Sequence, residues 1–87
     1  MTTPPKTIIY MLWWTGKNKT LQQFTDKILI AVEYYVKKYN MLPDLIEVNI
    51  ADLLGSELKT IKFSNKYIPV EVSEDVTINS IFVGKEA

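Results

Sequence analysis

The chain has 87 residues, no formal net charge at pH 7, and neither cysteine nor histidine. A chain of this length forms one domain with a small core, and 47% apolar with 23% charged residues is typical of a folded globular protein. The sequence offers no thiolate, and it lacks the residue that serves most often as zinc ligand and acid–base catalyst. We therefore expect no catalytic residue, metal or cofactor, and a reducing compartment such as the cytoplasm.

The first patterned segment, Thr7–Thr15, predicts a β-strand. It follows residues 1–5, which we expect to form a frayed terminus because proline fits neither a helix nor a sheet ladder easily. The apolar run inside it is too short to span a membrane, so no membrane segment is expected. Such a strand is either central and covered on both sides, or covered by the helix on one side and by something outside the monomer on the other. Alternation gives it two apolar faces, one with Ile8, Tyr10, Leu12 and Trp14, the other with Ile9, Met11 and Trp13.

The longest periodic segment, Leu21–Tyr39, predicts an amphipathic helix. Thr20 and Gln23 have the spacing of a capping box at its start. Asn40 is suited to the left-handed conformation at its end, and Pro43 prevents the helix from resuming. The apolar stripe that should face the core consists of Leu21, Phe24, Ile28, Ala31, Val32, Tyr35 and Tyr39.

The remainder of the chain predicts further strands at Leu45–Ile50, Thr60–Ser64, Tyr67–Ser73 and Asn79–Gly84, with one helical turn at Ala51–Leu54. The strand–helix–strand order predicts parallel pairing of the first two strands. Pro69 lacks a ladder donor, which predicts an edge strand or an N–H position that faces outward. The whole chain, residues 1–87, is therefore predicted as a single α+β domain. One long amphipathic helix packs on a mixed four- or five-stranded sheet, in the order β-α-β-β-β-β.

Four short motifs carry a resemblance to a family. They are KKYN at 37–40 with Pro43 after it, IEVN at 46–49, IPVEV at 68–72 and NSIFVG at 79–84. Together they resemble small helix-plus-meander proteins of bacteria and their mobile elements, over Val36 to Gly84. Those relatives usually have glycine where Asn40 stands and proline where Ile50 stands. The family has no assigned activity, so the resemblance implies a fold and no mechanism.

Two apolar residues, Ile30 and Tyr34, lie one turn apart on the polar side of the predicted helix. With lysines around them, they have the character of a self-complementary helix contact with a polar rim, as two-fold dimers use. If the second face of the sheet is open, Trp13 with Met11 and Ile9 would add an apolar patch there. The sequence thus predicts a non-enzymatic interaction or accessory module that self-associates, most simply as a dimer, or that binds another protein partner. The candidate interface residues are Ile30, Tyr34, Lys27, Lys37, Trp13 and Met11.

Three other interpretations of these residues stay open. Tyr34 and the neighbouring lysines, including Lys38, could bind single-stranded nucleic acid by stacking and charge neutralisation. Alternatively, loops of the chain itself could bury the outer side of the helix. A small enzyme using carboxylates or Tyr and Lys is the third possibility, although Asp52, Glu57, Glu74 and Asp75 are expected to be solvated turn and cap residues.

Overall fold

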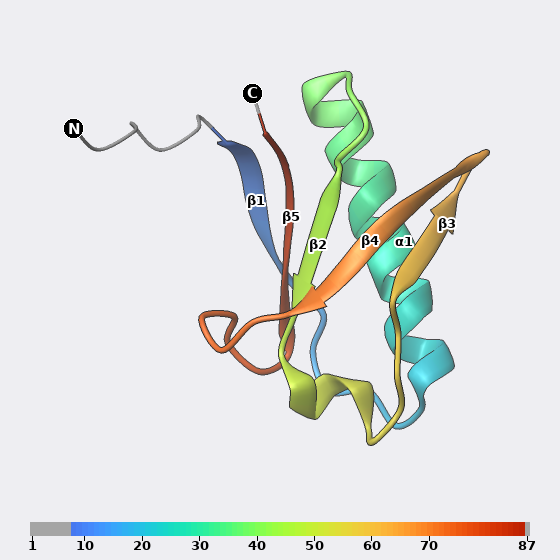
Figure 1. Ribbon diagram of the computed structural model, residues 1–87, viewed down its shortest axis with the longest axis vertical. Helices are drawn as coiled ribbons and strands as arrows, with labels where there is room; N and C mark the ends of the chain where they lie inside the picture. The colour runs from blue at the N-terminus through green and yellow to red at the C-terminus, as the bar shows by residue number, and fades with distance from the viewer. Residues whose placement is uncertain (1–7, 87) are drawn as a thin grey trace.

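The computed structural model describes residues 8–86, so the predicted frayed terminus lies outside the described part of the chain. The α+β class and the element order β-α-β-β-β-β are confirmed. Figure 1 shows the helix on one side of the sheet. In chain order the elements are β1 (Ile8–Trp14), α1 (Leu21–Tyr39), β2 (Leu45–Val48), the 3-10 turn η1 (Ile50–Leu53), β3 (Thr60–Phe63), β4 (Lys66–Val72) and β5 (Ser80–Glu86).

The five strands form one mixed sheet in the order β1-β5-β2-β4-β3. Only β2 and β4 pair in parallel, and every other neighbouring pair is antiparallel. The predicted direct pairing of the first two strands is wrong, because β5 lies between β1 and β2 and pairs with both. The seven-residue ladder between β1 and β5 links the two ends of the described chain. Because β1 stands at one end of the strand order, it is an edge strand.

Helix α1 begins and ends where the sequence predicts. The Gln23 amide donates to Thr20 Oγ1 at 3.1 Å, while the Gln23 side chain accepts from the Lys19 amide at 2.9 Å, one residue earlier than in an ideal capping box. At the other end Asn40 has φ 54° and its amide donates to the Val36 carbonyl at 2.8 Å. These two local devices fix the length of the helix that covers the sheet.

The core lies between α1 and one face of the sheet. The helix contributes Phe24, Ile28, Ala31, Val32 and Tyr35, all fully buried. The sheet contributes alternate residues of each strand, among them Met11, Ile46, Val48, Ile61, Ile68, Val70, Ile81 and Val83. No helix of the described chain covers the opposite face, which is called the open face below. Within residues 8–86, no helix has both the length and the apolar composition that crossing a membrane requires.

Pro69 does not mark an edge strand, since β4 lies between β2 and β3. It occupies the last position of the β3 ladder, opposite Thr60, and the pairing with β2 begins at the next residue, Val70. The Val70 amide still donates to the Lys59 carbonyl on the β3 side, so the nitrogen of Pro69 faces the β2 side, where the ladder begins only at Val70. A residue without an N–H is therefore tolerated at this point.

Candidate functional site

The open face carries large apolar side chains along β1. Leu12 and Trp14 are each 68% exposed and Tyr10 is more than half exposed. They occupy alternate positions of one strand, so their side chains share a face. On the neighbouring strand Phe82 stacks on Tyr10, with ring centroids 5.2 Å apart and planes at 21°. Together these four residues form an apolar strip along the β1 side of the sheet.

The residues on this strip differ from those that the sequence predicts for an open face. Trp13, Met11 and Ile9 were expected on the second face if that face were open, but the structure places Met11 in the core beneath α1, at 8% exposure. Ile9 and Trp13 pack against the same core and are partly buried. Both faces of β1 are apolar, so alternation alone could not decide which one the helix covers.

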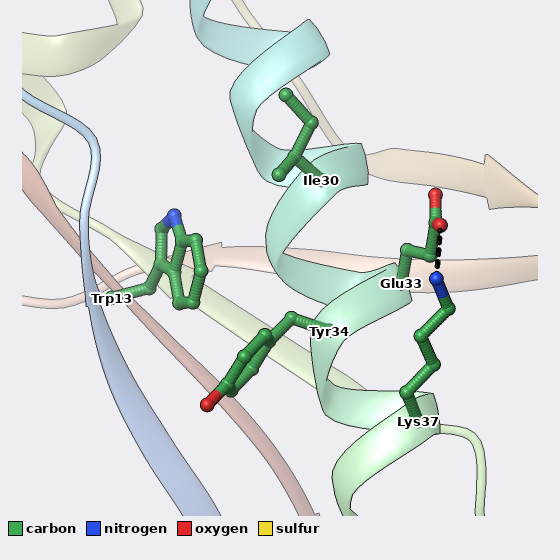
Figure 2. Close-up of a pocket in the computed structure, with 5 residues that line it drawn as sticks. All are labelled: Trp13, Ile30, Glu33, Tyr34 and Lys37. Atoms are coloured by element: carbon green, nitrogen blue, oxygen red, sulfur yellow. Dashed lines mark ion pairs between the residues drawn. The ribbon is translucent and has the colours of Figure 1, made fainter.

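Trp13 nevertheless meets the helix residues predicted for the interface. Its ring lies 5.0 Å from that of Tyr34, and Ile30 lies one helical turn from Tyr34 (Figure 2). Both helix residues are exposed, Ile30 at 57% and Tyr34 at 47%. Trp13, Ile30, Glu33, Tyr34 and Lys37 line an open hollow of about 350 Å³. Four of the six predicted interface residues therefore come together at one place.

The two remaining predicted residues are not part of this hollow. Met11 is in the core, and Lys27 donates from Nζ to the Thr15 carbonyl at 2.9 Å, which ties its side chain to the loop after β1. Lys37 does line the hollow, but its Nζ is 3.0 Å from Glu33 Oε1 on the same helix. Glu33 thus partly neutralises the charge of Lys37, and the Lys27 ammonium is held by a backbone carbonyl.

The strand between these two apolar regions is an unprotected sheet edge. β1 contains no charged residue, proline or glycine. Natural edges are usually short, charged or interrupted. The opposite edge of this sheet fits that pattern, because β3 is four residues long and carries Lys62 over the ring of Tyr67. We call the following residues of β1 and its flanks the β1 surface. Tyr10, Leu12 and Trp14 are exposed on the open face beside the partly buried Phe82, and Ile30 and Tyr34 are exposed on the helix side beside the partly buried Trp13.

A second hollow, of about 380 Å³, lies at the end of the sheet where η1 meets the loop after β1. The prediction that Asp52 is solvated is wrong, because the residue is buried. Its Oδ2 accepts from the Asn79 amide at 2.8 Å. Burial raises the pKa of the Asp52 carboxyl, and the hydrogen bond from Asn79 acts in the opposite direction.

The contacts of this polar cluster are with the backbone of the turns around it. The Asn79 carbonyl accepts from the amides of Thr15 and Gly16, and the Asn18 side chain donates to the Gly16 carbonyl at 3.1 Å. Asp52 thereby fastens η1 to the turn before β5, and the Asn79 carbonyl ties that turn to the loop after β1. The burial of Asp52 is therefore explained by its structural role, in which its carboxylate satisfies a backbone N–H group of a turn. In the described chain no group of three or more acidic, histidine or cysteine side chains is arranged to hold a metal ion.

No protein-family model matches the chain, and no curated protein or solved structure is significantly similar to it. The resemblance to helix-plus-meander proteins therefore stays a prediction.

Proposed function

We propose that this protein is a small non-enzymatic interaction module that self-associates through its β1 surface. The observation that carries the proposal is the exposure of Tyr10, Leu12 and Trp14 on an uncharged edge strand. Each such side chain contributes roughly 1.5–3 kcal/mol when it passes from water into an apolar contact. Contiguous apolar patches of this kind on soluble proteins commonly mark contact sites.

The helix side of the β1 surface supports the same proposal. Trp13, Tyr34 and Ile30 are next to one another, and the Glu33–Lys37 ion pair lies at the border of the hollow that they line. Aromatic anchors with a polar rim are typical of the centre of a protein interface. The sequence-based hypothesis of a contact around Ile30 and Tyr34 is retained, with Trp13 as its neighbour.

Single-stranded nucleic acid is a weaker candidate for the same surface. Lys27 is engaged with the Thr15 carbonyl and Lys37 with Glu33, so fewer cations are available for phosphates than the sequence suggests. The chain also has no net charge to attract a polyanion. For an enzyme, the buried carboxylate of Asp52 would be the starting point, but its contacts bind the turns of the fold together.

Mass measured by light scattering over a wide concentration range tests the proposal. The wild-type protein should rise above the mass of one chain as concentration increases. Replacing Leu12 and Trp14 by lysine should return it to the monomer, because a charged edge strand resists pairing. The matched control is Ile50→Lys, since Ile50 is 69% exposed but belongs to η1.

The helix side is tested separately by Ile30→Glu combined with Tyr34→Glu. A reduced mass for this variant at equal concentration would place the helix residues inside the contact. A wild-type protein that stays monomeric at the highest accessible concentration would overturn the proposed function.

A further inference from the structure

We propose that two copies of this chain pair their β1 strands antiparallel about a two-fold axis through Leu12, so that their sheets join into one. This inference rests on the proposed function and specifies the symmetry and the register of the self-association. It follows from the direction of the backbone groups of β1, from the charge of the strands and from the positions of the exposed side chains.

The backbone of β1 presents free pairing positions at the same residues that carry the exposed side chains. The Thr15 amide donates to the Asn79 carbonyl at 2.8 Å, in line with the register of the β1–β5 ladder. Along a strand of an antiparallel ladder, the backbone N–H and C=O groups of one residue point toward the neighbouring strand, and those of the next residue point away from it. Trp13 and Met11 therefore direct their N–H and C=O groups toward β5. The groups that face away from β5 belong to Tyr10, Leu12 and Trp14.

The outward carbonyl of Tyr10 has one weak contact within the chain. The Tyr39 hydroxyl donates to it at 3.4 Å, near the upper limit for a hydrogen bond. A carbonyl oxygen has two lone pairs and can accept a second donor. This contact is therefore compatible with a strand added beside β1.

A second copy of β1 is the partner that suits this edge. A strand added here continues the open-face strip on one side and meets the neighbourhood of Trp13 and Tyr34 on the other, so it should be apolar on both faces. Among the described strands only β1 satisfies this condition. The other four strands each carry at least one charged residue, which would have to be desolvated. Two neutral β1 strands bring no like charges together.

The exposed side chains select the register. Residues whose backbone groups point away from β5 must lie directly opposite the same kind of residue in the partner, which leaves a small set of symmetric alignments. The alignment centred on Leu12 places Tyr10 opposite the partner's Trp14 and Leu12 opposite the partner's Leu12. All three exposed residues of each strand then face exposed residues of the other, and the aromatic cross-strand pairs add to the stability of the ladder. The alignment centred on Met11 would instead place Trp14 opposite the partner's Ile8.

Single-cysteine variants test the register, because the natural sequence has no cysteine. Leu12→Cys should form a disulfide-linked dimer by itself under mild oxidation. Tyr10→Cys and Trp14→Cys should each cross-link poorly alone and efficiently when mixed. Lys62→Cys on the opposite edge strand is the control, and Leu12→Cys should react at least ~10-fold faster because paired thiols have an effective concentration in the millimolar range.

Amide hydrogen exchange supplies a readout that needs no substitution. The amides of Leu12 and Trp14 should be protected at high protein concentration and exchange at low concentration, whereas those of Met11 and Trp13 should be protected at both.

The outcomes separate this inference from the proposed function. A wild-type monomer at all concentrations removes both. A wild-type dimer in which Leu12→Cys reacts no faster than Lys62→Cys, with no concentration-dependent protection at Leu12, overturns the β1 pairing and leaves self-association intact. Efficient cross-linking of Leu12→Cys together with that protection supports the pairing.

Discussion

At the scale of single residues, Gly84 determines how the open face is built. A Cβ at this position would lie 2.8 Å from Phe82 Cε1 and 3.2 Å from Tyr10 Cβ, so the Phe82 ring occupies the space that a side chain would need. We expect Gly84→Ala to displace the ring and to lower the free energy of unfolding by about 1–3 kcal/mol, as overpacking does elsewhere. Urea unfolding measures the change.

A double-mutant cycle identifies the cause of that loss. In the background Phe82→Leu, the ring is absent and Gly84→Ala should cost clearly less. An equal cost in both backgrounds would show that the backbone of Gly84, and not the ring over it, sets the penalty.

Asp52 makes the stability of the protein depend on pH in an unusual direction for a carboxylate. Burial raises its pKa in the folded state above the ordinary value, so the folded protein holds this proton more tightly than the unfolded chain. The stabilisation that protonated Asp52 contributes to the folded state is fully present below the pKa of the unfolded chain. It is lost as pH rises through the pKa of the folded state. Because Asp52→Asn removes this titration, the stability of the variant relative to wild type should increase as pH rises from about 3 to 7.

Urea unfolding of both proteins across this pH range is the measurement. Asp26→Asn serves as the control, because Asp26 is an exposed carboxylate on α1. If the free energy of unfolding of Asp52→Asn relative to wild type stays constant, or falls as pH rises, the raised pKa assigned to Asp52 is contradicted.

At the scale of elements, the end of α1 depends on one left-handed residue. Asn40 has φ 54° and its amide closes the last turn on the Val36 carbonyl. Asn40→Ala should lower the stability by about 1 kcal/mol because a Cβ without a polar group is disfavoured in this conformation. Asn40→Gly should be neutral or slightly stabilising, since glycine adopts positive φ without strain. Thermal unfolding of the two variants compares them, and equal losses would show that the side-chain amide of Asn40, not its backbone conformation, matters.

The elements also show which parts of the fold could be predicted. The bounds of α1 follow from signals within a few residues of each end, at Thr20 and Asn40, and the structure has them there. The insertion of β5 between β1 and β2 depends on contacts between distant parts of the chain, which no local pattern encodes. The same holds for Asp52, whose burial depends on a turn 27 residues away.

At the scale of the whole molecule, only part of the candidate site could be predicted, because only part of it is marked by a local sequence pattern. Ile30 and Tyr34 break the helical pattern, so the sequence reveals them, and the structure shows both exposed. Tyr10, Leu12 and Trp14 lie in a strand that is apolar on both faces, and only the position of α1 decides which face stays open. The signal that could have identified β1 as an edge was absent, since it has neither the charge nor the proline that edge strands usually show.

Self-association should make the stability of the whole molecule depend on its concentration. If unfolding separates the copies, each tenfold increase in protein concentration adds about 1.4 kcal/mol per mole of dimer. For a chain of this size the melting temperature should then rise by roughly 3–5 °C per tenfold step. Calorimetry of wild type beside Leu12→Lys measures this, and the variant should melt at one temperature throughout.

Salt distinguishes the two sides of the β1 surface in the same experiment. Pairing through the uncharged strand β1 predicts a concentration dependence that 1 M salt leaves unchanged or strengthens, whereas a contact dominated by Lys37 and Glu33 should weaken because salt screens exposed charges. A wild-type melting temperature that is constant over a hundredfold concentration range at both ionic strengths would contradict self-association through either side.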